Sequence, residues 1–210
     1  MRIDTYGHAC LLVEDGGTRV LLDPGIYSNG FEGLRDLDAV VLTHSHPDHA
    51  DVDRLPALLA ANPDAQVLSD ATTAAQLTER AIARPTVLRP GDTADVGMAI
   101  AAVGGLHVPI HPDLGELDNI GVLLGGRLLH PGDSLVVPDD RVEILAVPIG
   151  GPWLKLSEAI DYVREVHPSV AIPIHGAGLT RPEMHVGHLK RLGQDDIDWR
   201  VPVPGESIEV

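Results

Sequence analysis

The chain has 210 residues, of which 44% are hydrophobic, and this length is enough to bury a substantial core. We therefore expect residues 1–210 to form a single domain. The formal net charge is −16 at pH 7, which disfavours binding to nucleic acid or to an anionic membrane, because the chain repels phosphate at long range. The sequence also contains no apolar run that approaches the length of a membrane span.

Two features of the chain bear on its compartment. The opening residues Met1–Asp4 lack the charged-then-apolar layout of a signal peptide and lead directly into an alternating strand pattern. The single cysteine, Cys10, cannot form an internal disulfide and is expected to be a small core residue. Both features favour a cytoplasmic protein. The sequence leaves the oligomeric state open, with a homo-oligomer as one option.

Short runs of Val, Leu and Ile between Gly, Pro and Asp predict strands from the first residues onward. Asp15-Gly16-Gly17 is predicted to be the turn of a hairpin between strands over Ala9–Glu14 and Val20–Asp23. In chain order, the next predicted elements are a buried strand over Ala39–Leu42, a short helix within Val52–Ala60, a strand over Gln66–Ser69, and a helix over Ala74–Ala83 capped by Asp70 or Thr72.

The rest of the chain continues to interleave strands and helices. Strands are predicted over Thr86–Leu88, Ala99–Val103, Ile120–Leu124, Arg127–Leu129, Glu143–Val147, Val170–Ile174 and Ser207–Val210, and helices from a cap at Ser157 to Val166 and near Pro182–Leu192. Two sheets packed face to face, with helices outside them, would bury all of these apolar runs. The expected fold class is therefore α/β.

The strongest chemical signal is the segment Thr43–His49, which places three imidazoles and a carboxylate directly after a buried strand. In an extended segment His44 and His46 project to the same side, because side chains alternate with a period of two. Pro47 then turns the chain, so that the two residues after it can face a neighbouring point. Zinc usually takes four nitrogen or oxygen ligands, and the chain supplies more donors than one ion needs. The sequence thus predicts two divalent ions, with Zn²⁺ preferred and Mn²⁺ or Fe as alternatives.

This segment resembles the metallo-β-lactamase superfamily, because Val41–His49 contains its H-x-H-x-D-H signature without a substitution. Other landmarks follow in the superfamily's order, namely Asp23 after the strand Val20–Leu22, Asp133 within His130–Ser134, and His175 within Ile172–Gly176. The resemblance covers roughly Met1 to Gly178, and several separated motifs in order are far more specific than one. It implies an αββα sandwich of two mixed β-sheets with outer helices and metal ions at one edge of the sheets.

The resemblance also implies a role for each of these residues. The first ion would be held by His44, His46 and one histidine from the middle of the chain, the second by Asp48, His49 and His175, and Asp133 would bridge the two. Asp48 would in addition act as a catalytic residue that orients the attacking water. Asp23 is grouped with it as a supporting residue. It would hydrogen bond near the metal-binding segment Thr43–His49, called the metal loop below, rather than coordinate an ion.

Two residues compete for the place of the middle histidine. His107 follows Gly104-Gly105-Leu106 after a predicted strand, which is where the superfamily's third ligand should stand, whereas His111 lies four residues later. We prefer His107, because ligands held on a rigid element are better preorganised. His111 is then expected to contact substrate or to be loop surface.

A narrower resemblance is to the ascorbate-6-phosphate lactonase-like branch of the superfamily. It rests on Tyr6-Gly7-His8-Ala9 and on the run Pro148–Trp153, both of which look similar to motifs of that branch. His8 is expected either to face the metal edge and contact substrate or to make a structural hydrogen bond. Trp153 is expected to be either a wall of the substrate pocket or a core residue.

The reaction class follows from the ligand set. Two bridged ions lower the pKa of a shared water, so we expect a metal-bound hydroxide to hydrolyse a small ester, lactone or phosphodiester-type metabolite. The chain lacks the zinc-ligand cysteine of secreted antibiotic-hydrolysing members, and its charge disfavours nucleic acid, which leaves a small metabolite, anionic ones included, as the expected substrate. The alternatives are an iron-dependent redox enzyme on the same fold, such as a sulfur dioxygenase, and a non-catalytic binding domain.

Overall fold

The strands of the chain form two seven-stranded mixed sheets in a computed structural model that describes residues 1–203 and 206–210. The first sheet has the order β14 (Ser207–Glu209), β1 (Arg2–Gly7), β2 (Cys10–Asp15), β3 (Thr18–Leu22), β4 (Ala39–Leu42), β5 (Gln66–Ser69) and β6 (Thr86–Val87). The second has the order β13 (Asp198–Trp199), β12 (Val170–Ile174), β11 (Ile144–Pro148), β10 (Leu128–His130), β9 (Gly121–Leu124), β8 (Ala99–Val103) and β7 (Thr93–Asp95). Each sheet is antiparallel in one half and parallel in the other, with β3 and β10 at the change.

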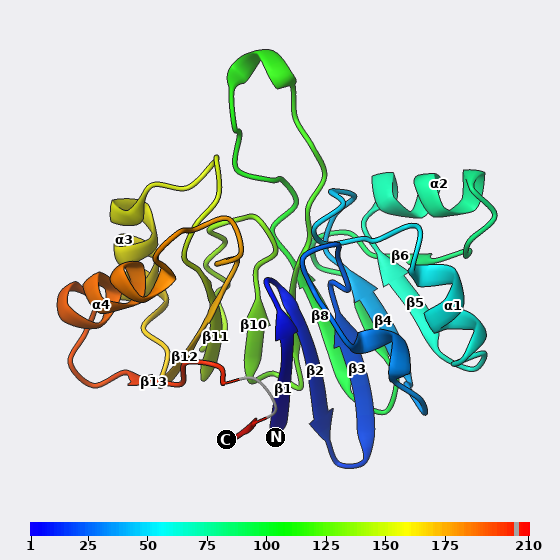
Figure 1. The fold of residues 1–210 in the computed structure, drawn as a ribbon, viewed down its shortest axis with the longest axis horizontal. Coiled ribbons are helices and arrows are strands. Elements are labelled where there is room, and N and C mark those ends of the chain that lie inside the picture. Colours follow the sequence, from blue (N-terminus) through cyan, green and yellow to red (C-terminus); the bar gives the residue numbers. More distant parts are fainter. Residues whose placement is uncertain (204–205) are drawn as a thin grey trace.

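Four helices cover the outer faces of the two sheets. Helices α1 (Leu55–Ala60) and α2 (Ala71–Glu79) lie beside the first sheet, and α3 (Leu156–Val166) and α4 (Pro182–Leu192) lie beside the second, at the opposite side of the molecule in Figure 1. One apolar cluster fills the space between the sheets, and two others fill the spaces between each sheet and its helices. The predicted αββα sandwich of two mixed sheets is confirmed.

The near-continuous apolar strands are explained by burial on both faces. In β2, Leu11 and Val13 face the space between the sheets, whereas Cys10 and Leu12 pack in the cluster under α1 and α2. Strands buried on both faces need apolar residues at successive positions rather than at alternate ones. The expectation that Cys10 is a core residue is therefore confirmed.

The strand ends bring residues that are distant in sequence to one edge of the sandwich. Asp23 follows β3, the Thr43-His44 pair follows β4, and His175 follows β12. His8 stands in the turn between β1 and β2, and its carbonyl oxygen accepts a hydrogen bond from the backbone N–H of His175 at 2.9 Å. This backbone bond joins the first sheet to the second at the edge where the histidines gather.

Several element boundaries differ from the sequence prediction. Helix α3 begins at Leu156 rather than after a Ser157 cap, because the carboxylate of Glu158 accepts a hydrogen bond from the backbone N–H of Lys155 at 2.9 Å. Helix α2 is capped by Asp70, which is one of the two predicted caps. It ends at Glu79 rather than at the predicted Ala83. The two short strands β7 and β13 were not predicted. Within residues 1–203 and 206–210, no helix has the length and apolarity that a membrane crossing requires.

Candidate metal centre

A first group of potential metal donors combines residues from both sheets. One donor atom from each of His44, His46, His107 and Asp133 lies within 4.8 Å of the others. His44 Nε2 is 3.1 Å from His46 Nδ1, and His107 Nε2 is 3.3 Å from Asp133 Oδ2. Three imidazoles and a carboxylate form a donor set that suits zinc and other first-row divalent ions.

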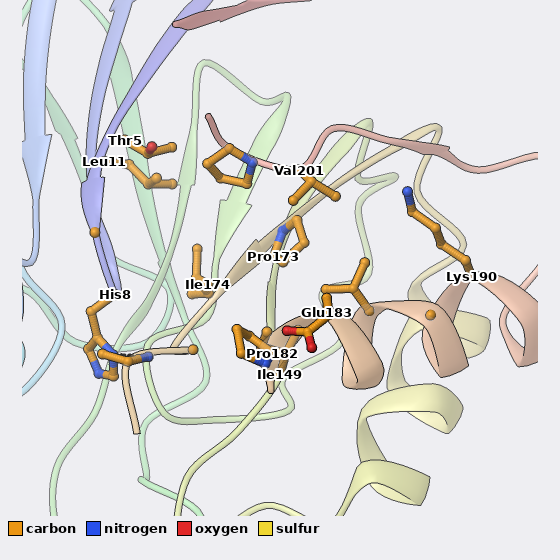
Figure 2. A pocket seen from close by; sticks show the side chains of 16 residues that line it. Thr5, His8, Leu11, Ile149, Pro173, Ile174, Pro182, Glu183, Lys190 and Val201 are labelled. Atoms are coloured by element: carbon orange, nitrogen blue, oxygen red, sulfur yellow. Dashed lines mark hydrogen bonds between the residues drawn. The ribbon is translucent and has the colours of Figure 1, made fainter. Parts of the chain in front are cut away.

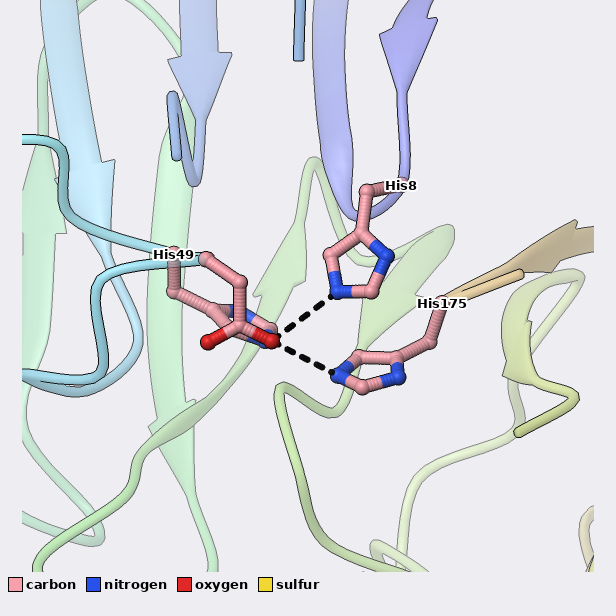
Figure 3. A group of neighbouring side chains, drawn as sticks. His8, His49 and His175 are labelled. Atoms are coloured by element: carbon pink, nitrogen blue, oxygen red, sulfur yellow. Dashed lines mark hydrogen bonds and ion pairs between the residues drawn. The ribbon is translucent and has the colours of Figure 1, made fainter. Parts of the chain in front are cut away.

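A second group lies beside the first and consists of His8, Asp48, His49 and His175. Figure 3 shows the rings of His8 and His175, from different sheets, directed to the same place beside His49. Asp48 Oδ2 is 3.1 Å from His8 Nε2 and 3.5 Å from His175 Nε2. The structure thus brings His8 into a donor group, in contact with Asp48.

Asp133 stands between the two groups and presents one oxygen to each. Its Oδ1 is 3.0 Å from His49 Nε2 and 3.1 Å from His175 Nε2. Its Oδ2 faces the first group, at 3.3 Å from His107 Nε2 and 3.9 Å from His44 Nε2. A carboxylate in this position is able to bridge two ions.

The hydrogen-bonding state of these atoms fits metal binding. Among the described residues, His49 Nε2, His107 Nε2, His175 Nε2 and Asp133 Oδ1 are buried and have no hydrogen-bond partner. Buried polar atoms are rarely left unpaired, because the loss of hydration without a partner costs about 1–3 kcal/mol each. Four such atoms converging on one place have the chemistry and the arrangement that divalent ions require.

Asp23 fixes the orientation of the metal loop. Its carboxylate is fully buried and accepts hydrogen bonds from Thr43 N at 2.8 Å and Thr43 Oγ1 at 2.7 Å. His49 Nδ1 lies 2.7 Å from Asp23 Oδ2, which favours the tautomer that leaves His49 Nε2 free to coordinate. This carboxylate–imidazole pairing is the arrangement that orients metal-binding histidines, and it supports the assignment of Asp23 to a supporting role.

A buried asparagine that sequence reasoning missed holds the Asp133 turn. Asn119 Oδ1 accepts a hydrogen bond from Asp133 N at 3.0 Å, and its Nδ2 donates to Pro131 O at 3.0 Å. Gly132 between them has a φ of 60°, and a Cβ there would lie 2.3 Å from Asn119 Oδ1. The sequence signal for this role is an asparagine directly before the apolar run Ile120–Leu124, and it is a weak one.

The sequence predicts that His107 stands at the end of a strand. In the structure it enters the first donor group from a loop instead. Strand β8 ends at Val103, and the loop is held by the bond from His107 N to Leu117 O at 2.9 Å. His107 Nδ1 lies 2.5 Å from Val108 O, which leaves Nε2 for coordination. His111 lies outside both groups, with a side chain 63% exposed, so the structure brings His107 and not His111 to the site.

Charges at the site influence one another strongly. Burial opposes ionisation of Asp133, but the charge of His49 and contacts with His107 and His175 outweigh it and hold the pKa of Asp133 well below its usual range. Burial favours the neutral ring of His175, yet the Asp133 and Asp48 carboxylates raise its pKa to about 9. For His44, burial and the neighbouring His49 charge both lower the pKa. Protons therefore occupy part of the site when no metal competes for it.

We expect the affinity of the metal-stripped protein for Zn²⁺ to increase with pH up to about 9. His175 is protonated below its raised pKa in the folded protein, and coordination requires the neutral ring, so the ion bound by the second group must displace a proton there. The dissociation constant should fall by about tenfold per pH unit for each proton displaced. Competition titrations against a chromophoric chelator, from roughly pH 6.5 to 8.5, measure this dependence; a pH-independent affinity would contradict it.

Two cavities meet at His8 and are otherwise lined by different residues. A cavity of about 360 Å³ beside the second donor group is lined by His8, Ile26, Tyr27, Pro47, Asp48, Gly151, Pro152, His175 and Gly178. A larger cavity of about 560 Å³ lies between β1, β12 and α4, with Leu11, Ile174 and Lys190 among its lining residues (Figure 2). The larger cavity includes His8 alone of the predicted site residues, so the smaller one is the candidate substrate pocket.

Trp153 lies behind the donor histidines. It is buried, and its ring centroid is 5.8 Å from that of His107 and 5.9 Å from that of His175. Its chain neighbours Gly151 and Pro152 line the smaller cavity, whereas Trp153 is not among the lining residues. Substrate contact by Trp153 or by the exposed His111 stays a prediction.

The chain is similar to known proteins over nearly its whole length. The profile described as the beta-lactamase superfamily domain matches residues 2–175. The chain is 48% identical over 216 residues to Protein Rv0786c of Mycobacterium tuberculosis, covering 99% of this chain and 98% of that protein. It is 31% identical over 240 residues to a UPF0173 metal-dependent hydrolase of Aeropyrum pernix, covering 99% of this chain and 97% of that one.

A solved structure extends the similarity to the whole fold. The metallo hydrolase Igni18 of Ignicoccus hospitalis superposes with a TM-score of 0.76 at 22% identity, over 99% of this chain and 97% of that one. The predicted superfamily resemblance is confirmed by the profile match over most of the chain. These near full-length similarities place the chain in the β-lactamase superfamily, as a member of the UPF0173 family of metal-dependent hydrolases.

Proposed function

We propose that the chain is a dinuclear hydrolase that acts on a small ester, lactone or phosphodiester-type metabolite. The observation that carries this proposal is the pair of adjacent donor groups with Asp133 between them. In this assignment His44, His46 and His107 hold one ion, Asp48, His49 and His175 hold the other, and Asp133 contacts both. Zn²⁺ suits this set of nitrogen and oxygen donors, and Mn²⁺ or Fe are the alternatives.

Two ions in these positions would supply a nucleophilic hydroxide at neutral pH and would polarise the substrate oxygen. The chain's own residues then orient the reactants. Asp48 lies at the wall of the pocket, 22% exposed in its side chain, and in this proposal it would hold the attacking water and accept its proton. His8 contacts Asp48 Oδ2 and keeps that carboxylate directed toward His175, within the second group. Asp23 acts through His49 and Thr43.

The ascorbate-6-phosphate lactonase-like motifs support lactones among the candidate substrates. His8 from the first of these motifs lines the pocket, as do Gly151 and Pro152 from the second. An iron-dependent redox enzyme is not favoured, because relatives that span nearly the whole chain are named metal-dependent hydrolases. A non-catalytic binding domain is opposed by the completeness of both donor groups.

The proposal predicts two divalent ions per chain. Eight donor residues in two groups exceed what one tetrahedral ion can use. Elemental analysis of protein purified without chelator, and again after loading with Zn²⁺ or Mn²⁺, measures the content. A reproducible content of one ion or less after loading would rule out the dinuclear assignment.

Replacing the middle histidine separates metal binding from substrate contact. We expect His107→Ala to lose the ion of the first group, because His107 Nε2 faces Asp133 within that group. His111→Ala is the matched control and should retain both ions, because His111 is exposed and lies outside both groups. Metal content after identical purification tests the pair, and metal loss in His111→Ala alone would reverse the assignment.

A further inference from the structure

We propose that this site selects substrates whose group beside the scissile bond is uncharged and apolar, and that Ile26 and Tyr27 are the residues that determine this specificity. The inference rests on the proposed hydrolase function and names the class of substrate for the same site. It narrows the sequence-based expectation, which included anionic metabolites.

Among the described residues, no lysine or arginine lines the smaller cavity. Apart from His8, Asp48 and His175, the lining consists of Ile26, Tyr27, Pro47, Gly151, Pro152 and Gly178. Ile26 is 47% exposed and Tyr27 is 52% exposed, in a chain that otherwise buries most large apolar residues. Exposed apolar side chains beside a polar centre are typical of binding sites.

The loop that carries these two residues is held in place by the metal loop. Ile26 N donates a hydrogen bond to Pro47 O at 2.9 Å, and Asp51 N donates to Pro24 O at 3.1 Å. The ring of Tyr27 packs edge-on against that of His8, with centroids 5.3 Å apart. The apolar wall is therefore formed before substrate binds, and little ordering cost opposes the binding of an apolar group.

Arg54 is the cation attached to this loop, and its guanidinium is already paired with two carboxylates and two backbone carbonyls. Its Nε contacts Asp51 Oδ2, its Nη1 contacts Glu32 Oε1 at 2.7 Å, and its Nη2 donates to Gly25 O at 2.7 Å. The guanidinium also lies over the ring of Phe31, 4.5 Å from its centroid. Arg54 thus fixes the backbone of the loop and is not available to pair with a carboxylate or phosphate on a substrate.

An anionic group on the distal part of a substrate would have no partner in this pocket. The ions would contact the reacting group, and a second negative charge would lose hydration against apolar walls without a compensating hydrogen bond. Lys190 lines the larger cavity, which shares His8 alone with the pocket. The overall charge of −16 opposes anions further.

The test uses a series of esters that differ in chain length, together with pairs of ligands that differ only in the terminal charge. Turnover is measured with 4-nitrophenyl acetate, butyrate and hexanoate and with the 4-nitrophenyl half-ester of adipic acid, on protein loaded with metal. Binding is measured by calorimetry with hexanohydroxamic acid and its ω-carboxylate counterpart, whose head group binds metal without being hydrolysed. We expect kcat/KM to increase by about fourfold per buried methylene. The neutral ligand of each pair should have a kcat/KM or an affinity about tenfold or more above that of its carboxylate counterpart.

Ile26→Lys places a cation on the wall of the pocket. It should raise kcat/KM and affinity for the carboxylate ligands and lower them for the neutral ligands, so that both ratios fall or invert. Leu114→Lys is the matched control, because Leu114 is 70% exposed and does not line the pocket, and it should leave both ratios unchanged. Equal or better use of the carboxylate ligands by the unaltered protein would overturn the inference, as would unchanged ratios in Ile26→Lys. Selective binding of the neutral hydroxamate without turnover of any ester, lactone or phosphodiester would support the inference and contradict the hydrolase proposal.

Discussion

Asp133→Ala is expected to lower kcat/KM by about 10³-fold or more and to reduce the content of both metal ions. Asp133 presents Oδ1 to His49 and His175 and Oδ2 to His107 and His44, so one substitution removes a donor from each group. Losses of at least this scale are seen when a single preorganised group that stabilises the transition state is removed. The measurement is metal content together with kcat/KM on an ester that the wild-type protein turns over.

Asp23→Asn provides the comparison for this variant. Asp23 contacts His49 and Thr43 rather than the donor groups' common centre, so the loss should stay within about 10–100-fold. Both variants replace a buried carboxylate, and the difference between them isolates direct contact with the ions from support of a ligand. Retention of two ions and of wild-type turnover in Asp133→Ala would contradict the bridging role.

Gly25→Ala should also lower activity strongly, through a purely steric route. A Cβ at this position would lie 1.8 Å from the carbonyl oxygen of Asp48 and 2.5 Å from the backbone nitrogen of His49, both of which are backbone atoms that cannot rotate away. The segment that carries two donors of the second group must therefore move. We expect destabilisation of about 1–3 kcal/mol. A shift of about 1 Å at these donors should lower kcat/KM by about 10²-fold.

Gly33→Ala is the matched control for this substitution. No atom lies within 4 Å of a Cβ built at Gly33, which ends the 3-10 helix Phe31–Gly33 of the same long loop. Urea unfolding and metal content of the two variants should separate, with Gly33→Ala close to wild type. If Gly25→Ala retained wild-type stability and its second ion, the close approach of this loop to Asp48 would not matter for the site.

Donors that are close in sequence were predictable because local geometry fixes them. A strand followed by Pro47 keeps the imidazoles and the carboxylate of Thr43–His49 within one short segment, and Asp23 then orients Thr43 and His49. Asp133 and His175 carry little local signal, and their inclusion depended on the order of motifs in the superfamily. The structure adds their positions relative to both groups.

Other residues could not be identified from the sequence because their roles depend on long-range contacts. Asn119 supports Asp133 across 14 positions of the chain, and Arg54 reaches Gly25 across 29. The sequence favours His107 because a strand is expected to end there, but the strand stops four residues earlier, and a loop contact with Leu117 holds His107 instead. Periodicity and capping rules describe single elements, and these contacts join separate ones.

Because the donors are divided between the two sheets, bound metal ions would hold the two layers of the fold together. Each group draws on both layers, since His175 joins three donors from the first sheet, and His107 and Asp133 join His44 and His46. An ion held in this way would cross-link the two layers, because neither layer alone offers a complete coordination sphere. Free metal at 100 times the dissociation constant would add about 2.7 kcal/mol per site to the free energy of unfolding. Scarcity of metal in the cell would then lower the abundance of the folded protein as well as its activity.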